Sequence, residues 1–485
     1  MKCIAVDIGA TSGRVMTVTY ENGTFSYRED KRFVNRIYEK EGILRWDFSL
    51  LFDNIVSGIH EALKKSQDIV SIGIDTWAVD YGMLDREGRL LEDPVCYRDT
   101  HSFESQKKLQ EKIPFSEIYA IAGIQDLHFN TIYQLYGRRK ELEKADRILM
   151  IPDLIAYFLG GEKRIEYTNL STTSLFDPRK QEISARLLEA IGIKKDIFPE
   201  IIHPGESYGV LSRTLFPELE RDIPILAVPT HDTASAVLGT DGFDDFAYLS
   251  SGTWSLLGTE LKEPIITKES MKANFTNELG YDHTVRFLKN TMGMFIANEL
   301  RKNFLDMEEP IPVEEIVPLV EESKDVDCFI DPDDPLFETP GDMIYKVDSY
   351  LERTRQERLR GRGEYLRVIY QSMAINYGLV LDNLMRIGGR KFDSLIIVGG
   401  GNQAEILNRY AACATGVRVE TGPIEATILG NALAQFIANG AIADKEEGRR
   451  RLKDSIAVRT YMPQDLKTWA RKKERFIQTT GKGGI

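Results

Sequence analysis

The chain is poor in cysteine and histidine, and this limits the metal and redox chemistry open to it. Four cysteines occur among 485 residues, and they form no Cys-x-x-Cys pair. This pattern argues against a zinc site and a disulfide scaffold, and favours reduced, buried thiols. The five histidines other than His231 show no metal-ligand spacing. The cysteines are Cys3, Cys96, Cys328 and Cys413.

Long apolar runs and an excess of positive charge are also missing. No stretch approaches the roughly 20 apolar residues of a membrane span. The first residues do not resemble a signal peptide, because Asp7 interrupts a short apolar run. The formal net charge is −13, so no basic face is indicated that could follow a nucleic-acid backbone. We therefore expect a cytoplasmic protein that binds neither membranes nor nucleic acid.

Two common nucleotide-binding motifs are absent as well. The G-x-x-x-x-G-K-[ST] spacing of a Walker loop does not occur, and no G-x-G-x-x-G follows the first predicted strand. The second absence argues against a nicotinamide-dependent dehydrogenase. A phosphorylated ligand stays open, because local amides and cations can bind an anion against the net charge.

The composition is that of an ordinary globular protein, with 42% hydrophobic and 28% charged residues. The length suits two large domains, and a Gly- and Asp-rich stretch predicts a boundary near residue 240. We expect an N-terminal domain at 1–240, a C-terminal domain at 241–450, and a helical extension with a tail at 451–485. The acidic, proline-rich segment at 306–342 predicts a surface insertion with a short helix.

Both halves of the chain are predicted to open with two strands joined by a turn of small residues. In the first half a helix follows Asp47, which is placed to cap it. In the second half a glycine-rich turn leads into a helix that ends at Gly416. This pattern suggests an internal duplication. The predicted strands are 3–7, 14–20, 24–28, 69–77, 394–400 and 417–421, with a strand pair in 246–261, and the predicted helices lie in 47–67, 402–416 and 424–439.

The first candidate site is AVDIGATSGR at 5–14, where an apolar strand runs into a turn. Its two glycines allow backbone angles closed to other residues, and Thr11 and Ser12 add hydroxyl donors. Successive amides in such a turn can form an anion-binding nest. Arg14 could add positive charge, and Asp7 could reach a phosphate-bound Mg²⁺ through water. The alternative is a tight hairpin turn that binds nothing.

The second candidate site is PTHDTASAV at 229–237, where a predicted strand ends and an alanine-rich helix begins. Asp232 stands near the positive end of the helix dipole, which stabilises a carboxylate. It could act as a general base that accepts a proton from a sugar hydroxyl. The alternative is structural: Asp232 caps the helix, and His231 is a loop residue.

Four further stretches have the composition of ligand loops. VGGGNQAE at 398–405 would let an adenine ring or an α-phosphate approach the backbone, and SSGTWSLLG at 250–258 resembles a second phosphate loop. DTWAVDYGMLD at 75–85 is polar and aromatic, as sugar sites often are. In LKNTMGMF at 288–295, Asn290 could hydrogen-bond a hydroxyl. The structural alternatives are tight turns and, for 75–85, a half-buried strand with alternating faces.

Taken together, these motifs resemble the FGGY carbohydrate kinases of the actin and hexokinase superfamily. The resemblance spans about residues 3–440, and the combination of DTWAVDYG, THDTASAV and SSGTWSLLG is specific, although each alone is not. It also rests on AVDIGATSGRV, YRDTHS, KNTMGMF and residues 398–431. The resemblance implies an α/β fold of two actin-like (ribonuclease H-like) domains, with mixed sheets flanking an ATP-binding cleft.

The resemblance also implies roles for individual residues. Asp232 would be the catalytic base, and Asp7 would organise Mg²⁺ through water. Asn298 stands where the family has a glutamine that contacts ATP, and it is the shorter amide. The substrate-binding residues would be Ala78, His231, Asp232, Thr233 and Asn290. The ATP-binding residues would be Ala10, Thr11, Ser12, Gly13, Arg14, Thr253, Asn298, Gly400 and Gly401.

The implied activity is transfer of the γ-phosphoryl group of ATP to the 1-hydroxyl of a ketose, by a monomer or homodimer that uses Mg²⁺. Within the family, the resemblance implies L-rhamnulose, an intermediate of rhamnose catabolism, as the ketose. The Lys-x-x-Trp pattern of glycerol and xylulose kinases is absent after Thr131. Sister activities on L-fuculose or xylulose stay open, as does a non-catalytic, actin-like nucleotide-binding scaffold. Asp232 argues against the scaffold, which has no need of a base.

Overall fold

The computed structural model describes residues 1–240, 242, 246–455 and 457–483. Contacts divide the chain into two compact units. The first unit comprises Met1–Phe243, Glu260–Phe287 and Glu425–Ile456, and the second comprises Asp244–Thr259, Leu288–Ile424 and Ala457–Ile485. Part of the boundary expected near residue 240 (241 and 243–245) and the end of the expected tail (484–485) lie outside the described residues.

The first unit contains a six-stranded mixed sheet with the order β13-β14-β6-β1-β2-β3. Strands β14, β6 and β1 are parallel, whereas β1 with β2, β2 with β3 and β13 with β14 are antiparallel. The carboxyl ends of β1, β6 and β14 therefore meet at one edge of the sheet. The strands are β1 (Lys2–Ile8), β2 (Ser12–Glu21), β3 (Thr24–Val34), β6 (Ile69–Thr76), β13 (Ser207–Val210) and β14 (Pro224–Leu226).

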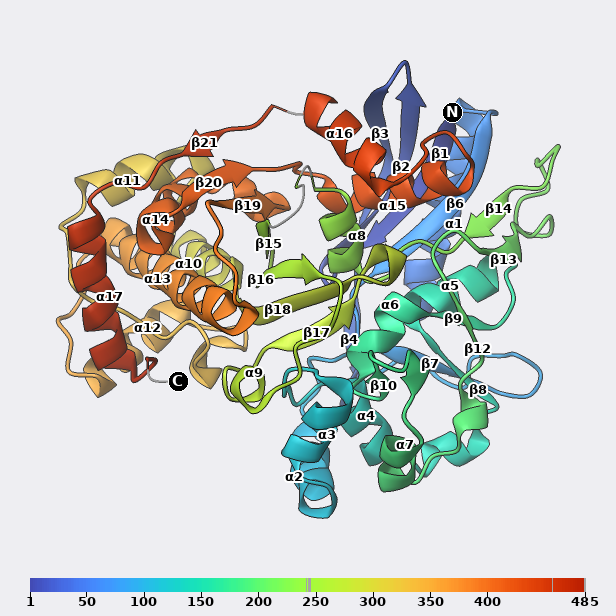
Figure 1. Cartoon of the computed structure of the whole chain (residues 1–485), viewed down its shortest axis with the longest axis horizontal. Coiled ribbons are helices and arrows are strands. Elements are labelled where there is room, and N and C mark those ends of the chain that lie inside the picture. Colours follow the sequence, from blue (N-terminus) through green and yellow to red (C-terminus); the bar gives the residue numbers. More distant parts are fainter. Residues whose placement is uncertain (241, 243–245, 456, 484–485) are drawn as a thin grey trace. The chain divides into compact units, whose positions relative to one another are not determined.

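Alternating residues of β1 pack on opposite faces of this sheet, as the period of two in a strand requires. Ile4, Val6 and Ile8 pack in one buried cluster with α1 (Phe48–Lys65) and α5 (Ile151–Leu159). Cys3 and Ala5 pack in a second cluster with α15 (Ala426–Ala438). Figure 1 shows α15, in red, beside the blue strands of this sheet. Both faces are covered, so β6 is buried along nearly its whole length.

Helix α15 explains why the first unit is not one continuous stretch of chain. Its apolar side chains complete the core of the first sheet, although they are more than 180 residues away in sequence from α8 (Asp232–Leu238). Two glycines allow the two helices to approach closely. A Cβ on Gly430 would lie 1.8 Å from the Ser235 carbonyl oxygen, and one on Gly239 would lie 2.0 Å from that of Ala426.

The compact units therefore differ from the contiguous ranges expected from the sequence. Residues 260–287 and 425–456 group with the first unit, although both were expected in or beyond the C-terminal domain. The expected limit at 450 also falls inside α16 (Lys445–Ser455), whose Leu452 belongs to the core beneath α15. Hydrophobic periodicity gives the type of an element but not the sheet on which it packs.

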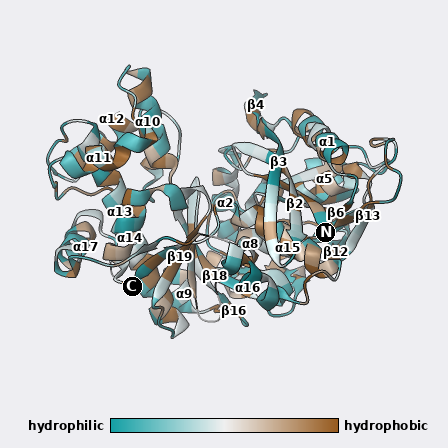
Figure 2. Cartoon of the chain, turned by 90° about the horizontal axis from the view of Figure 1, so that it is seen from above, coloured by the Kyte–Doolittle hydropathy of each residue, from teal (hydrophilic) through white to brown (hydrophobic). Residues whose placement is uncertain are grey.

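The helix α1 illustrates how local sequence determines an element of the first unit. The Asp47 side chain accepts a hydrogen bond from the Leu50 N–H at 3.2 Å, so the predicted cap is confirmed. Leu51, Ile55 and Ile59 are buried at helical spacing. Figure 2 shows hydrophobic and hydrophilic residues mixed along α1. Burying one such side chain stabilises the fold by roughly 1.5–3 kcal/mol.

The remaining strands of the first unit lie outside this sheet, and all but β17 form two-stranded sheets of their own. Its other strands are β4 (Ile37–Lys40), β5 (Ile43–Trp46), β7 (Tyr81–Leu84), β8 (Arg147–Met150), β9 (Arg164–Glu166), β10 (Phe176–Asp177), β11 (Glu182–Ile183), β12 (Glu200–Ile202) and β17 (Thr276–Leu279). Its other helices are α2 (His101–Lys112), α3 (Phe115–Ala122), α4 (Thr131–Gly137), α6 (Tyr167–Leu170), α7 (Ala185–Ile191) and α9 (Lys268–Lys272).

The second unit repeats the central pattern of the first. Its strands lie in the order β18-β16-β15-β19-β20-β21, with β15 parallel to β19, β19 parallel to β20, and β15 antiparallel to β16. This shared arrangement is consistent with the predicted duplication. The strands are β15 (Ala247–Ser251), β16 (Trp254–Leu261), β18 (Val285–Met292), β19 (Ser394–Val398), β20 (Arg418–Thr421) and β21 (Thr460–Tyr461). Of β16 and β18, residues 254–259 and 288–292 belong to this unit, and the rest belong to the first.

The helices of the second unit agree with the sequence pattern in their main features. Gly416 ends α14 in the left-handed conformation, with φ 73°, as predicted. The acidic segment contains the short helix α11 (Ile316–Glu322). The other helices are α10 (Phe295–Asp306), α12 (Met343–Arg353), α13 (Arg362–Gly388), α14 (Glu405–Thr415) and α17 (Leu466–Thr480). In the part of the chain that the structure describes, every helix is too short or too polar to cross a membrane.

Candidate active site

Three carboxylates gather at the edge of the first sheet where its parallel strands end. Asp7 on β1 lies opposite Asp75 on the neighbouring strand β6. Thr76 at the end of β6 forms an isolated parallel bridge with His231, so the segment after β14 lies next to it. The Thr76 N–H donates to the Thr230 carbonyl oxygen at 2.9 Å. Asp232 is thereby brought to the same edge as the other two carboxylates.

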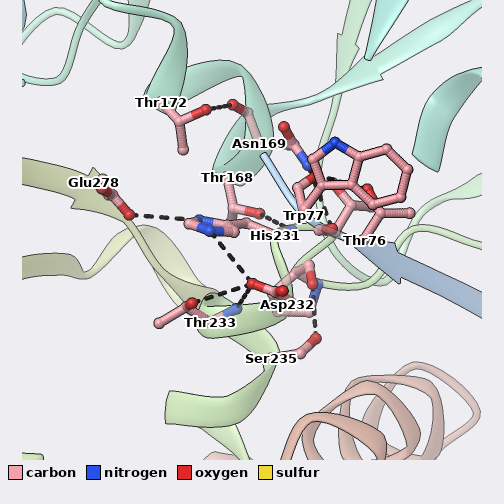
Figure 3. Close-up of polar contacts among 12 residues, drawn as sticks. Thr76, Trp77, Thr168, Asn169, Thr172, His231, Asp232, Thr233, Ser235 and Glu278 are labelled. Carbon is pink, nitrogen blue, oxygen red and sulfur yellow. Dashed lines mark hydrogen bonds and ion pairs between the residues drawn. The ribbon is translucent and has the colours of Figure 1, made fainter. Parts of the chain in front are cut away.

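Asp232 has one carboxylate oxygen held and the other available. Its Oδ1 accepts from the Thr233 N–H at 2.6 Å and from the Thr233 hydroxyl at 3.1 Å (Figure 3). Within the described residues, Oδ2 has no hydrogen-bond partner, and 31% of the side chain is exposed. Burial and the Asp7 carboxylate raise the pKa of Asp232, although His231 and Thr233 act against them. Such a carboxylate can accept a proton from a ligand hydroxyl.

His231 is buried beside Asp232 and faces it with one ring nitrogen. His231 Nε2 lies 3.4 Å from Asp232 Oδ1, and Nδ1 lies 3.4 Å from Glu278 Oε2. Figure 3 shows the imidazole between these two carboxylates. His231, rather than Asp232, is the N-cap residue of α8, and its side chain makes no cap bond. The structural alternative, with Asp232 as the cap, therefore does not describe this helix.

Asp75 is fully buried behind the other two carboxylates. Its Oδ2 accepts from the Asn431 amide of α15 at 2.6 Å, and Oδ1 has no partner among the described residues. Burial and the neighbouring carboxylates of Asp7 and Asp232 raise its pKa well above the ordinary value. A Cβ on Gly73 would lie 2.6 Å from the Asn431 amide oxygen, so the glycine makes room for this contact.

The hairpin turn between β1 and β2 exposes backbone N–H groups at the same edge. The turn is closed by a hydrogen bond from the Gly9 N–H to the Ser12 carbonyl oxygen at 2.9 Å, and the Asn35 N–H donates to Thr11 at 3.0 Å. In the described part of the chain, the N–H groups of Ala10 and Thr11 have no partner. They can bind an anion, as a nest requires.

The two glycines of this turn serve a different purpose from the one expected. Neither Gly9 nor Gly13 has a positive φ, so the turn does not need their conformational freedom. Gly13 is required for space instead, because a Cβ there would lie 2.3 Å from the Phe33 ring. The close approach of β3, rather than an unusual backbone angle, explains this glycine.

Arg14 is held between two carboxylates of the first unit. It donates to Asp7 Oδ2 at 2.5 Å and to Glu425, the residue that precedes α15. Although burial opposes the charge, Asp7 and Glu425 raise the pKa of Arg14 further. The guanidinium is therefore fixed next to Asp7 and the N–H groups of the turn.

Ala78 lies in a turn that follows β6 rather than in an extended strand. Val79 has φ 69°, which is rare for a β-branched residue, so the expected alternation of faces stops here. Asp80 holds the turn: its Oδ2 accepts from the indole N–H of Trp46 at 2.7 Å and of Trp77 at 2.9 Å. Burial raises the pKa of Asp80 to about 6 despite these hydrogen bonds.

In the second unit, three loops meet at the ends of β15, β18 and β19. The hairpin turn contains Thr253, whose carbonyl oxygen accepts from the Gly293 N–H at 3.2 Å. A Cβ on Gly401 would lie 2.0 Å from the Ser251 hydroxyl oxygen, whereas a Cβ on Gly400 would meet nothing within 4 Å. The loops are therefore in contact, and the Gly400 face is open to a flat ligand.

The two asparagines predicted as site residues of the second unit lie on consecutive elements, β18 and α10. Asn290 is on β18, and Asn298 is exposed in the first turns of α10, where its N–H donates to Met294 at 2.9 Å. The predicted residues thus form two groups, each within one unit. The first group contains Asp7, residues 10–14, Ala78 and residues 231–233, and the second contains Thr253, Asn290, Asn298, Gly400 and Gly401.

Comparison with known proteins identifies the group to which these two sites belong. Residues 2–239 match the N-terminal domain of the FGGY family of carbohydrate kinases, and residues 247–439 match its C-terminal domain. The chain belongs to the FGGY family of carbohydrate kinases. It is therefore a carbohydrate kinase, as the motifs predicted.

Curated FGGY relatives align over nearly the whole chain. A protein of Bacteroides thetaiotaomicron named rhamnulokinase is 38% identical over 475 residues, which are 96% of this chain and 96% of that protein. A Bacillus subtilis protein of the same name is 36% identical over 467 residues, 95% of each chain.

Solved structures show that the fold is the two-domain α/β actin-like kinase fold with mixed sheets. Xylulose kinase from Lactobacillus acidophilus superimposes with a TM-score of 0.81, covering 99% of this chain and 96% of that one at 17% identity. Plasmodium falciparum glycerol kinase with ADP has a TM-score of 0.77, with 98% and 97% coverage at 16% identity.

Several polar residues of this FGGY kinase site are missing from the sequence prediction. Asp75 is the first residue of the motif DTWAVDYGMLD, but its position in the sequence does not distinguish it from an aspartate that merely ends a strand. Glu278, Glu425 and Asn431 reach the site from segments distant in sequence, and only the tertiary fold brings them there. Among the described residues no cluster of three or more His, Cys, Asp or Glu side chains could hold a metal ion by itself.

Proposed function

We infer that this kinase transfers the γ-phosphoryl group of ATP to the 1-hydroxyl of L-rhamnulose, giving L-rhamnulose 1-phosphate in rhamnose catabolism. The observation that carries this inference is the 38% identity to a curated rhamnulokinase over 96% of both chains. Other curated proteins of that name align at similar identity. Sister activities on L-fuculose or xylulose and the non-catalytic scaffold are not favoured.

Asp232 is the proposed catalytic base. Phosphoryl transfer passes through a loose transition state, so the protein mainly positions groups and stabilises charge. With Oδ1 held by Thr233 and Oδ2 free to meet a ligand, Asp232 can orient the 1-hydroxyl and accept its proton as the O–P bond forms. The pKa of Asp232 is raised above its ordinary value, which brings the carboxylate closer to the range suited to a general base.

The β1–β2 turn is the proposed phosphate site of the first unit. The N–H groups of Ala10 and Thr11, the Ser12 hydroxyl and the Arg14 guanidinium would contact the phosphates, with Gly13 keeping β3 close behind the turn. A protein commonly binds Mg²⁺ through one or two carboxylates, with water and substrate phosphates completing the shell. Asp7 fits this role, and the ion would neutralise phosphate charge.

The other predicted contacts complete the proposal. Ala78, His231, Thr233 and Asn290 would bind the ketose, and Thr253, Asn298, Gly400 and Gly401 would contribute the nucleotide contacts of the second unit. A kinase that consumes ATP fits the cytoplasm, and we propose a monomer or homodimer.

A ketose panel tests this function directly. ADP release is measured with L-rhamnulose, L-fuculose, xylulose and no sugar, at matched ATP and Mg²⁺. We expect the highest kcat/KM for L-rhamnulose. A higher value for another ketose would reassign the substrate, and ATP hydrolysis that ignores every ketose would overturn the kinase assignment.

A further inference from the structure

A buried ion pair lies behind His231, on the side opposite Asp232. Glu278 on β17 and Arg286 on β18 both belong to the first unit, and Arg286 is fully buried. Arg286 Nη2 lies 3.1 Å from Glu278 Oε2 and 2.9 Å from His231 Nδ1. Arg286 Nε also donates to the Leu279 carbonyl oxygen at 3.2 Å, which fixes the guanidinium plane.

This geometry determines which ring nitrogen of His231 carries the hydrogen. A guanidinium has only donors, so the 2.9 Å contact requires His231 Nδ1 to accept. In the neutral imidazole the N–H is then on Nε2, the nitrogen that faces Asp232 Oδ1 (Figure 3). The partner of one ring nitrogen commonly sets the role of the other in this way.

Glu278 allows the cation to occupy this position. A buried guanidinium without a counterion would be costly, and Glu278 supplies the negative charge. Burial alone would favour the neutral acid, but the Arg286 guanidinium lowers the pKa of Glu278 below its usual value. The pair is therefore charged. Arg286, and not the Glu278 carboxylate, is the hydrogen-bond partner of His231 Nδ1.

We propose that Arg286 and Glu278 are positioning residues that lock His231 in the tautomer with its hydrogen on Nε2. This proposal rests on the proposed function, in which Asp232 is the catalytic base. Nε2–H can donate to Asp232 Oδ1 or to a ketose oxygen at the same place, which leaves Asp232 Oδ2 to accept the proton of the 1-hydroxyl. With the opposite tautomer, a lone pair would face the carboxylate and push it away.

The two members of the pair are predicted to have unequal effects. In Arg286→Met, the unpaired Glu278 carboxylate attracts a hydrogen onto His231 Nδ1, 3.4 Å away, and the lock is lost. In Glu278→Gln, Arg286 still donates to Nδ1, so the tautomer is kept. The double variant Glu278→Gln/Arg286→Met removes both charges and is expected to recover part of the loss.

Arg449 offers a matched control within the first unit. It is similarly buried, its Nη1 lies 3.0 Å from Glu260 Oε2, and its Nη2 donates to the Val237 carbonyl oxygen at 2.9 Å. Arg449→Met therefore breaks a comparable buried ion pair without touching His231. A loss of kcat shared by the two variants measures damage to the fold. An additional loss of kcat in Arg286→Met measures the effect of the His231 tautomer.

The experiment combines ¹⁵N NMR of histidine-labelled protein with kinetics. In the wild type we expect His231, assigned with His231→Gln, to show an unprotonated Nδ1 and a protonated Nε2. In Arg286→Met we expect Nδ1 to become protonated and kcat to fall roughly tenfold more than in Arg449→Met, with a smaller change in ketose KM. Glu278→Gln should keep the wild-type tautomer.

A protonated Nδ1 in the wild-type protein would overturn the proposal without any variant. Equal kcat losses in Arg286→Met and Arg449→Met would overturn it as well. If L-rhamnulose proved not to be the substrate, the NMR result would still stand, so the two failures are distinguishable. If Arg286→Met failed to fold, the wild-type NMR spectrum would still decide the proposal, because it reports directly which ring nitrogen of His231 carries the hydrogen.

Discussion

The two units share a sheet pattern but differ in what their strands carry at the carboxyl end. In the first unit, Asp7 and Asp75 are the penultimate residues of β1 and β6, and Asp232 lies in the segment after β14. In the second, β15 ends in serines, β19 runs into Gly399–Gly401, and Gly422 follows β20. The first edge concentrates negative charge and polar hydrogens, whereas the second presents backbone and small side chains.

This difference indicates that the two sheet edges have different roles, although the sheets share one strand arrangement. Clustered carboxylates shift the pKa of one another, which suits proton transfer and metal-linked phosphates. A glycine surface has no titratable group and suits the close approach of a flat ring. We therefore expect substitutions of the first unit's carboxylates to lower kcat, and substitutions in the glycine loops of the second unit to raise the KM for ATP.

After substitution of the proposed base Asp232, the largest effect is expected from Asp7→Asn. Losing this carboxylate removes one of the two carboxylate partners of Arg14 and the proposed Mg²⁺ contact, so kcat should fall about 10- to 100-fold. Because the Asp7 carboxylate raises the pKa of Asp232, its removal lowers that pKa. A base works only when deprotonated, so the acid limb of kcat/KM should move to lower pH. Steady-state kinetics across pH measures both effects.

The control for Asp7→Asn is Asp30→Asn on β3, where the carboxylate accepts from Thr17 and Arg28. It removes a charge from the same sheet away from the carboxyl ends of β1 and β6, so the pH profile should keep its shape. An unchanged acid limb in Asp7→Asn would show that the two carboxylates are not coupled.

A smaller effect is expected from Gly400→Ala in the second unit. Nothing lies within 4 Å of a Cβ at this position, so the melting temperature should not change. If the nucleotide lies against this face, the methyl group should raise the KM for ATP roughly tenfold. Gly388→Ala at the end of α13, where the space is equally open, is the matched control. Equal KM values for the two variants would remove Gly400 from the nucleotide site.

The smallest effects should come from the hydroxyls of the two hairpin turns. Ser12→Ala and Thr253→Ala each remove one proposed donor near the nucleotide, and neither fills new space. We expect each to raise the KM for ATP by about two- to fivefold, the scale of a single neutral hydrogen bond. Kinetics at varied ATP separates this from a change in kcat, and a kcat loss in Thr253→Ala larger than in Ser12→Ala would reverse the assigned roles.

Local sequence was sufficient for the elements that carry the site. The β1–β2 hairpin, the cap at Asp47, the helix end at Gly416 and the hairpin in 246–261 follow from periodicity and from turn and cap residues, and the structure contains all four. Each depends on contacts within a few residues, which a single sequence encodes directly.

Features that depend on tertiary contacts could not be predicted in this way. Helix α15 packs on the first sheet because its apolar face fits there, and its sequence would suit either unit. The roles of Asp75, Glu278 and Arg286 arise from neighbours distant in the chain. Gly13 was expected for its backbone freedom, whereas the structure requires it for the space taken by Phe33.

The turnover of Asp232→Asn tests the central claim most directly. The amide keeps the size of the side chain but cannot accept the proton, so a folded variant with near-normal ketose binding should lose roughly 10²-fold or more in kcat. Melting temperature and ketose affinity serve as controls in the same preparation. A kcat within a few-fold of the wild type would contradict the account, because the edge with three carboxylates would then not supply the base.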